Sequence, residues 1–345
     1  MHTVELLLSG GIPPRNANKG DNLARTTEIG KLMDAAQARI FGGMPELLRS
    51  RLQKRLVLDR PDVVLAEYGT MGAEIAKACE QAGAPLVVHF HGFDAHRTDY
   101  IAHYGNYAEL FRYAAALVVV SRAMEQQLLA IGAPRAKVIY NCYGIDVEHF
   151  VPGDPSTAPP HFLAVGRFAE KKAPHLTIQA FNIALRQRPE AKITLVGQGK
   201  LWDRCQQLVQ ELGIGHAVDL CGVRTPDQIV ELMHRSRAFV QHSVVPADND
   251  HEGTPLAVLE AMASAVPVIA TRHAGIADVV KDDERGLLCE EHDIEAMATN
   301  MVRMIDSPQK ARAMGLAGRA YVEQHHRVEV QVANLQQILE RAAKR

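Results

Sequence analysis

The sequence predicts an α/β protein with two doubly wound domains, each a parallel β-sheet covered by helices on both faces. Three observations carry this prediction. Short apolar segments alternate with amphipathic helical segments along the chain, and wholly apolar strands separated by helices are typical of parallel sheets. The chain has 345 residues, which is too long for one ordinary domain. The segment 151–160, VPGDPSTAPP, has the composition of a linker and divides the pattern in two.

In the first half of the chain, apolar runs predict strands and helical spacing predicts the helices between them. The predicted strands are 4–8, 62–67, 85–90, 116–120 and 137–140. The predicted helices are 22–37, 46–58, 71–82 and 122–131, and helical turns are predicted to fill 99–114. Short crossovers between parallel strands make each such unit right-handed.

The second half repeats this alternation and ends in helices alone. The predicted strands are 161–165, 192–196, 218–221, 238–241, 267–270 and 286–289. The predicted helices are 174–186, 201–212, 226–234, 256–264, 294–305, 308–325 and 328–343. We therefore predict a first domain over residues 1–152, a second over 153–325, and a C-terminal helix over 326–345 that packs back on the first domain.

Composition excludes several classes of protein. The net charge is −2 and aromatic residues make up 5% of the chain, so neither a basic field nor a base-stacking surface argues for nucleic acid. The cysteines are scattered, odd in number and without a CxxC pair, which predicts reduced thiols and a cytoplasmic protein. No apolar run approaches 18 residues and residues 1–10 lack a charged n-region, so we expect neither a membrane span nor a signal peptide.

One predicted helix, from Glu46 to Leu58 (ELLRSRLQKRLVL), carries leucines on one face and basic residues around the rest. A basic amphipathic helix can lie on anionic lipid, which would give the protein a peripheral membrane contact. The alternative is a surface helix whose basic face is solvated. The sequence leaves both interpretations open and favours the second.

The stretch 248–274 (DNDHEGTPLAVLEAMASAVPVIATRHA) is the most informative part of the chain. A polar loop leads into a helix whose apolar positions Leu256, Leu259 and Ala263 share one face, and Pro255 suits the first helical position. The N-terminus of a helix offers unpaired N–H groups and a positive dipole end, which favour an anion. Glu252 precedes the helix and Glu260 lies within it. A carboxylate in so apolar a run predicts a polar ligand, and the alternative is a solvated side chain.

Three other loops follow predicted strands and carry unusual residues: HFHGFD at 89–94, GRFAEKK at 166–172 and GQG at 197–199. Ligands of doubly wound folds bind at the carboxyl ends of strands. Gly166 and Gly197 permit close approach of a ligand to the backbone. Arg167 and Lys172 form a suitable grip for a diphosphate, although two cations at this spacing are also common on plain surfaces.

The acidic loop Asp248-Asn249-Asp250, with His251 beside it, admits two interpretations. It could bind a metal through a DxD pattern, or it could be a solvated loop that faces an acceptor. We favour the second, since the histidines show no HExxH or similar ligand spacing. No metal and no cofactor are therefore expected.

Together these motifs resemble those of the retaining glycosyltransferases of family 4, which have the GT-B fold of two Rossmann-like domains that face each other across a cleft. The matching segments are GRFAEKK, LVGQG, the EGTPLAVLEAMA block with its two glutamates eight positions apart, and PVIATRHAGI followed by GLL. The similarity extends from about residue 85 to the C-terminus. It is finest to the colanic-acid and exopolysaccharide type, through HFHGFD, YAELFR and the acidic loop.

The resemblance implies a role for each matching residue. Arg167, Lys172 and the backbone of Gly253, Thr254, Pro255 and Leu256 would hold the donor diphosphate without a metal, next to Gly166 and Gly197. Glu260 would accept the ribose hydroxyls, and Gly222 and Val223 would lie near the base. His91 and Glu252 would act on the transferred sugar as the catalytic pair, and no enzymic nucleophile is assigned.

The implied function is transfer of a hexose, with retention, from a nucleoside-diphosphate sugar to a lipid-linked or oligosaccharide acceptor in exopolysaccharide or lipopolysaccharide biosynthesis. UDP-hexose is the favoured donor and GDP-mannose the second. The alternatives are a non-catalytic nucleotide-sugar-binding module, or an inactive truncated relative, and a nucleotide-sugar epimerase, for which the sequence offers no convincing acid/base carboxylates.

The chain departs from the family pattern at three places. Ala173 and Ala265 stand where the family usually has glycine, and either position could require a positive φ, where alanine costs about 1 kcal/mol. The chain also begins where relatives begin their second strand, so a missing first strand of the N-terminal sheet is expected.

Overall fold

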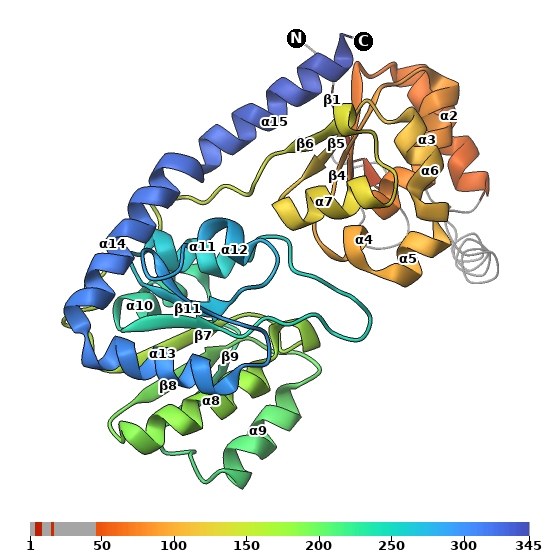
Figure 1. Cartoon of the computed structure of the whole chain (residues 1–345). Coiled ribbons are helices and arrows are strands. Elements are labelled where there is room, and N and C mark those ends of the chain that lie inside the picture. Colours follow the sequence, from red (N-terminus) through yellow and green to blue (C-terminus); the bar gives the residue numbers. More distant parts are fainter. Residues whose placement is uncertain (1–3, 9–14, 17–45, 345) are drawn as a thin grey trace. The chain divides into compact units, whose positions relative to one another are not determined.

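A computed structural model describes residues 4–8, 15–16 and 46–344 (Figure 1). The chain forms two compact units, which are described separately. Unit 1 comprises Met1–Asn141 and Val332–Arg345, and unit 2 comprises Cys142–Gln331. The predicted helix 22–37 lies outside the described residues. Among the residues that are described, no helix is both long and apolar enough to cross a membrane.

The sheet of unit 1 has the strand order β2-β1-β3-β4-β5-β6. Its strands pair in parallel, except that β2 is antiparallel to β1. Their bounds are β1 (Val4–Leu8), β2 (Arg15–Asn16), β3 (Val63–Glu67), β4 (Leu86–His89), β5 (Ala116–Val119) and β6 (Val138–Tyr140). The strand predicted at 4–8 lies directly beside β3. The prediction of a doubly wound parallel sheet is thus confirmed.

The helices of unit 1 are α2 (Glu46–Asp59), α3 (Gly69–Ala82), α4 (Phe93–His96), α5 (Thr98–His103), α6 (Ala108–Tyr113) and α7 (Arg122–Ala130). Helical turns fill most of 99–114, as predicted, and they form three separate elements. Asn106 and Tyr107 adopt φ values of 54° and 57°, and two successive left-handed residues end the hydrogen-bond ladder of an α-helix. The chain makes a 3₁₀ turn there, Gly105–Tyr107, before α6 begins.

Helix α2 buries part of the leucine face that could have lain on lipid. Leu52 and Leu56 are each 2% exposed, and α2 packs on α3. These two leucines therefore stabilise unit 1 and are not available to a membrane, whereas Leu47 of the same face is 36% exposed. Among the described side chains of α2, the apolar ones that are most exposed are Val57 and Leu58, at 47% and 78%.

The last helix of the chain, α15 (Val328–Ala343), starts in unit 2 and ends in unit 1. Its later turns place Ile338, Leu339 and Ala342 in one buried cluster with Val63, Leu65, Val87, Ala116 and Val118. These strand residues share one face of the first sheet. The C-terminal segment therefore covers a sheet face that would otherwise expose apolar surface.

The sheet of unit 2 is parallel throughout, with the order β12-β11-β10-β7-β8-β9. Its strands are β7 (His161–Val165), β8 (Lys192–Val196), β9 (Val218–Gly222), β10 (Ala238–Gln241), β11 (Val268–Thr271) and β12 (Gly286–Cys289). Its helices are α8 (Pro174–Gln187), α9 (Trp202–Glu211), α10 (Pro226–His234), α11 (Leu256–Ala263), α12 (Ile276–Val279), α13 (Ile294–Asp306) and α14 (Pro308–His325). Apart from the short α12, the sequence predicted each of these elements.

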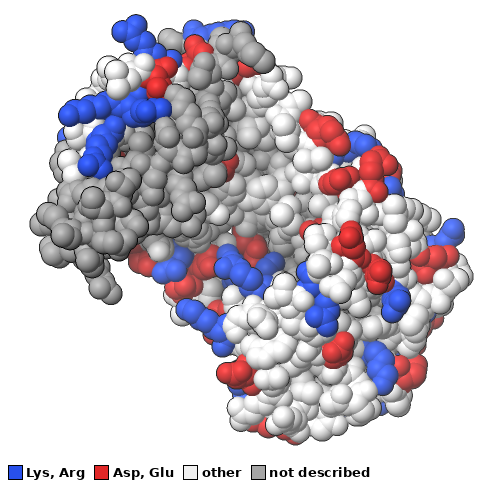
Figure 2. All heavy atoms as spheres, turned by 180° about the vertical axis from the view of Figure 1, so that it is seen from behind, with Lys and Arg blue, Asp and Glu red and all other residues white. Residues whose placement is uncertain are grey.

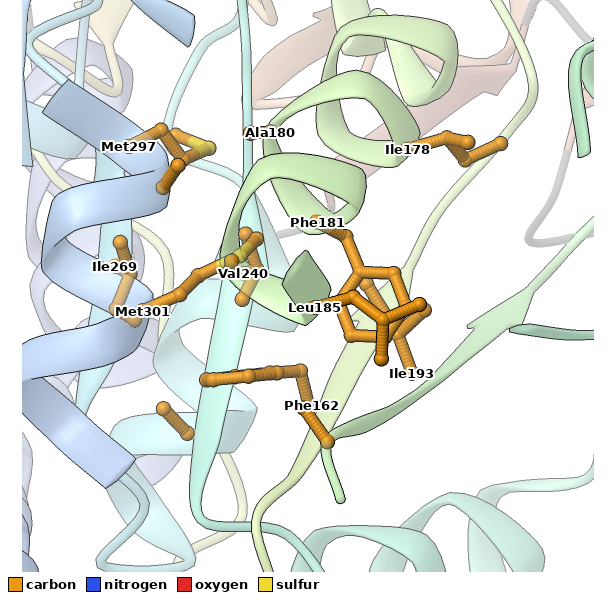
Figure 3. Packing of buried hydrophobic residues seen from close by; sticks show 14 of the residues in the cluster. Phe162, Ile178, Ala180, Phe181, Leu185, Ile193, Val240, Ile269, Met297 and Met301 are labelled. Carbon is orange, nitrogen blue, oxygen red and sulfur yellow. The ribbon is translucent and has the colours of Figure 1, made fainter. Parts of the chain in front are cut away.

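Alternation along the strands gives unit 2 a core on each face of its sheet. Val240 and Ile269 point to the side where α8 and α13 supply Phe181 and Met297 (Figure 3). Their chain neighbours Phe239 and Val268 belong to the opposite cluster, with residues of α11 and α14. Both faces of the sheet are buried, which explains why the strands are continuous apolar runs in the sequence. On the face of unit 2 that Figure 2 shows, acidic and basic side chains are interspersed.

The Pro-rich segment 151–160 belongs to unit 2. Arg237, which is 7% exposed, donates hydrogen bonds to the carbonyl oxygens of Pro155 and Ala158 at 2.7 and 2.6 Å. The same guanidinium donates to the carbonyls of Met304 and Ile305 at 3.1 and 3.0 Å. One buried cation thereby ties this segment to the end of α13.

Ala173 and Ala265 both have positive φ, 37° and 56°, as their departure from glycine suggested. At Ala265 the cause is a Schellman motif that ends α11: the N–H of Ala265 donates to the carbonyl of Met262 at 3.0 Å, and that of Val266 to Ala261 at 2.9 Å. This closure needs a left-handed residue after the C-cap, the position where glycine is usual.

We expect Ala265→Gly to raise the free energy of unfolding of unit 2 by about 1 kcal/mol, because glycine removes the steric cost of the left-handed conformation. Trp202, the single tryptophan of the chain, lies in unit 2 and reports its unfolding in urea. Ala261→Gly, the same change inside α11, is the control and should lower stability by at least 1 kcal/mol. Equal destabilisation by both variants would contradict the argument.

Candidate functional site

Glycines let two loops cross closely at the carboxyl edge of the second sheet. A Cβ on Gly197, whose φ is 133°, would lie 1.9 Å from the carbonyl oxygen of Gly166. The N–H of Gly166 donates to Val196 at 2.9 Å, and that of Gly197 donates to Gly222 at 2.8 Å. Gly222 itself has a φ of 69°. The ends of β7, β8 and β9 are thus joined by backbone contacts, and the approach of Gly197 to Gly166 is one that only glycine allows.

Lys172 and Glu252 form the charged centre of this edge. Lys172 Nζ lies 3.3 Å from Glu252 Oε1, and their side chains are only 15% and 9% exposed. The pair makes an ion contact without aligned hydrogen-bond geometry, since this carboxylate oxygen has no hydrogen-bond partner. Burial would raise the pKa of Glu252, but Lys172 and Lys171 outweigh it and lower that pKa. Burial lowers the pKa of Lys172, and Glu252 partly offsets this effect.

Glu260 lies one and a half turns into α11 and is partly buried. Burial raises its pKa, while Lys172 and His149 act in the opposite direction. A carboxylate that is dehydrated in this way gains when a ligand offers it hydroxyl groups. Lys172 acts on its charge, so a carboxylate that can accept hydroxyl groups lies within electrostatic reach of this buried cation.

The start of α11 differs from the prediction in two details. Pro255 is the N-cap, with φ −63° and ψ 121°, and the helix begins at Leu256. Leu256 does not share the buried face of Leu259, since its side chain is 46% exposed. The first turn therefore points an apolar side chain outward, and its backbone N–H groups remain at an accessible helix end.

The turn before α11 is held by another close backbone approach. A Cβ on Gly275 would lie 2.2 Å from the carbonyl oxygen of Gly253 and 2.4 Å from Thr254 Oγ1. The N–H of Gly275 donates to the Gly253 carbonyl at 3.0 Å. Thr254 is 2% exposed, so the turn at Gly253 and Thr254 is packed closely against the rest of unit 2.

The other predicted residues of unit 2 are more open. Arg167 is exposed, and Val223 is 68% exposed. Arg167 nevertheless lines one hollow together with Gly166 and Lys172, and Lys172 is the buried cation that contacts Glu252. The structure thus brings Gly166, Arg167, Lys172, Glu252 and Glu260 together and leaves Val223 exposed.

A histidine that the sequence analysis did not single out supports Glu252. His273 is 1% exposed; its Nε2 accepts the backbone N–H of Glu252 at 3.2 Å, and its Nδ1 lies 2.6 Å from Glu291 Oε1. Glu291 Oε2 also accepts the N–H of Val245 at 2.8 Å. The available signal was a histidine within PVIATRHAGI, directly after a buried strand.

The acidic loop is less solvated than expected. Lys171, which is 9% exposed, donates to Asp250 Oδ1 at 2.8 Å and to the carbonyl of His251 at 3.4 Å. Asp248 remains exposed, and Asn249 has a φ of 58°. Lys171 therefore holds the loop by Asp250, while the adjacent Lys172 contacts Glu252.

In unit 1, His91 follows β4 and forms a cluster with two residues that the sequence analysis did not select. Glu67 Oε2 accepts a hydrogen bond from His91 Nε2 and lies 3.3 Å from His89 Nδ1. These are the described residues whose ligand atoms could hold a metal ion, since they all lie within 4.8 Å of one another. The sequence feature that could have revealed Glu67 was a carboxylate directly after the apolar run 63–66, at the end of a predicted strand.

Two doubly wound parallel-sheet units, with a glycine-lined crossing and a charged helix N-terminus at a sheet edge, define a protein of the GT-B architecture. The chain belongs to the family of group 1 glycosyl transferases. The family's sequence profile, "Glycosyl transferases group 1", matches residues 148–321. A second profile, "Glycosyl transferase 4-like domain", matches residues 2–144. The resemblance drawn from the motifs is confirmed.

Among the curated relatives is WcaL of Escherichia coli (strain K12), a proposed colanic acid biosynthesis glycosyltransferase. It is 30% identical over 248 residues, which make up 70% of this chain and 61% of that protein. The amylovoran biosynthesis glycosyltransferase AmsK of Erwinia amylovora is 30% identical over 288 residues, or 82% of this chain and 70% of that protein. The chain therefore spans less than two thirds of the first relative and somewhat more of the second.

Solved structures show the same fold. Anabaena Alr3699/HepE in complex with UDP-glucose superposes with a TM-score of 0.74 and 20% identity, covering 88% of this chain and 83% of that one. Sucrose-phosphate synthase from Thermosynechococcus elongatus gives a TM-score of 0.72 at 21% identity, covering 86% and 77%. At these identities the likeness concerns the fold.

Proposed function

We propose that the chain transfers a hexose from a nucleoside-diphosphate sugar to a glycan acceptor in exopolysaccharide or lipopolysaccharide biosynthesis, with retention of configuration. The observation that carries this proposal is the grouping of Lys172, Glu252 and Glu260 around the N-terminus of α11. A cation and a helix N-terminus bind a diphosphate, and two carboxylates of different burial suit two sets of hydroxyls. The family membership supports the same conclusion.

In this proposal each group has one task. Lys172, Arg167 and the N–H groups at the start of α11 neutralise the charge that develops on the leaving nucleotide. Glu260 accepts the ribose hydroxyls, and Gly222 and Val223 flank the base. Glu252 accepts hydroxyls of the sugar, so the donor separates the ion pair that Lys172 and Glu252 form without it.

UDP-hexose is the favoured donor, because the structural relative HepE was crystallised with UDP-glucose. GDP-mannose is the second candidate, since another relative, from Mycolicibacterium smegmatis, is a GDP-mannose-dependent mannosyltransferase at 26% identity. The proposed acceptor is a lipid-linked or oligosaccharide glycan at the cytoplasmic face of a membrane. Any lipid contact would use the exposed face of α2 that carries Leu58, Lys54 and Arg51; sedimentation with anionic vesicles measures it.

A panel of UDP-glucose, UDP-galactose, UDP, GDP-mannose and GDP tests the donor. The cognate nucleotide at 100 times its Kd should stabilise the protein by about 2.7 kcal/mol, visible as a rise in Tm. Because cations of the protein take the place of a metal, EDTA should change neither this shift nor turnover. Absence of any shift would contradict the proposal. Binding without turnover on any glycan would indicate a nucleotide-sugar-binding module instead.

A further inference from the structure

The cluster of Glu67, His89 and His91 follows from the pairing of β3 with β4. Glu67 stands in register with His89 in this parallel pair. Paired residues project from the same face of a sheet, and alternation returns the chain to that face two residues later. Glu67, His89 and His91 therefore meet at the carboxyl edge of the first sheet, where doubly wound folds bind their ligands.

One oxygen of the Glu67 carboxylate, Oε2, contacts both imidazole rings. Oε2 accepts the hydrogen bond from His91 Nε2 and lies 3.3 Å from His89 Nδ1. The side chains are 21% exposed for Glu67, 19% for His91 and 10% for His89. Burial would raise the pKa of Glu67, but the hydrogen bonds and charges of the two histidines lower it to about 2. Glu67 is therefore an anion at neutral pH.

The backbone of His91 is held as firmly as its ring. The fully buried Asp94 accepts the N–H groups of His91 and Gly92 through Oδ1, at 3.0 and 2.9 Å, and that of Gly69 through Oδ2, at 2.7 Å. Between Glu67 and Gly69, Tyr68 has a φ of 76° and a ψ of 137°, a strained conformation for a side-chain-bearing residue. Its N–H donates to the carbonyl of His89 at 2.8 Å.

We propose that Glu67 is a positioning residue for His91, whose ring it orients and holds in one tautomer for contact with the transferred sugar. This inference rests on the proposed function. The contact between Nε2 and Glu67 leaves the other ring nitrogen, Nδ1, for a hydrogen bond with a sugar hydroxyl. Glu67 thereby fixes which nitrogen of His91 faces the sugar.

The same residues could be ligands of a transition metal, but the geometry favours the hydrogen-bonded arrangement. Ligand atoms about 2.0–2.1 Å from a tetrahedral zinc ion are roughly 3.3 Å apart. The contact between His91 Nε2 and Glu67 Oε2 is that of a hydrogen-bonded pair. Metal binding would also need this nitrogen deprotonated.

The kinetic test uses UDP-glucose hydrolysis, followed as UDP release, in the full chain. Glu67→Gln should lower kcat by about 100-fold, the order expected when a reacting group is misplaced. Binding of UDP, which lacks the sugar, should stay unchanged. Glu67→Asp keeps the charge and should recover part of the loss. Glu80→Gln, a half-exposed carboxylate paired with Arg112 in the same unit, should leave all values as in the wild type. Full kcat in Glu67→Gln would overturn the proposal.

A spectroscopic test does not depend on turnover. Imidazole ¹⁵N signals of histidine-labelled protein are assigned by their loss in His91→Gln and His89→Gln. The wild-type His91 signals should show a protonated Nε2, and Glu67→Gln should shift them toward a mixture of tautomers. Unchanged His91 signals would refute the positioning role.

The outcomes distinguish this inference from the proposed function. If no nucleotide sugar binds, the proposed function fails, and the ¹⁵N signals still decide whether Glu67 governs the His91 ring. Titration with Zn²⁺ alone tests the remaining alternative, in which Glu67, His89 and His91 bind a metal ion. Stoichiometric binding that is abolished in Glu67→Gln and that stimulates hydrolysis would show a metal centre and overturn the positioning role.

Discussion

Lys172→Ala is expected to lower kcat/KM for UDP-glucose by about 10²–10³-fold, the effect of removing one preorganised group that stabilises developing negative charge. The structure makes this lysine hard to replace. Its side chain is 15% exposed, it lies 3.3 Å from Glu252, and it also acts on the charge of Glu260. Without Lys172, burial would raise the pKa of Glu252. The variant would therefore lose the proposed phosphate contact and would also weaken Glu252 as the proposed acceptor of sugar hydroxyls.

Initial rates of UDP release in the wild type, Lys172→Ala and Lys172→Arg measure this effect. Lys200→Ala is the matched control, since Lys200 is an exposed lysine in the loop that follows β8, and it should change kcat/KM less than twofold. Glu260→Ala is the second arm and should lose nucleotide affinity as well as turnover. Turnover retained in the Glu260 variant would refute the ribose assignment.

Arg237→Leu should lower the free energy of unfolding of unit 2 by about 3 kcal/mol or more. The guanidinium donates to the carbonyls of Pro155, Ala158, Met304 and Ile305, and a buried acceptor that loses its donor costs about 1–3 kcal/mol. Burial lowers the pKa of Arg237, but an arginine stays charged across the accessible pH range.

Urea unfolding followed by Trp202 fluorescence measures this loss for unit 2. Arg235→Leu, two residues earlier and exposed, should stay within about 0.5 kcal/mol of the wild type. Similar midpoints for the two variants would show that the four hydrogen bonds contribute little. A selective loss in Arg237→Leu would show that the segment 151–160 is part of the folded unit.

Local patterns were sufficient for much of the fold and for finding the residues that unit 2 gathers at the candidate site. Apolar runs predicted the described strands of both sheets except the two-residue β2, because strands buried on both faces must be apolar throughout. Helical turns were predicted over 99–114, but their division into α5, a 3₁₀ turn and α6 was not, because helical spacing does not reveal the left-handed conformations of Asn106 and Tyr107. Pro255 was predicted at the first helical position and is the N-cap, and Leu256 was predicted on the buried face and is exposed. Helix ends depend on backbone angles, which composition does not determine.

The amino-acid sequence by itself determined the two doubly wound units, the family, and the residues from Gly166 to Glu260 that approach one sheet edge. These follow from periodicity and from short motifs, which are local properties of the chain. Only the tertiary structure decided that Lys172 pairs with Glu252, that His273 supports the same loop, and that Glu67 holds His91. Each of these contacts joins residues from different strand ends, and strand register, which brings such residues within hydrogen-bonding distance, is set by the packing of the whole sheet.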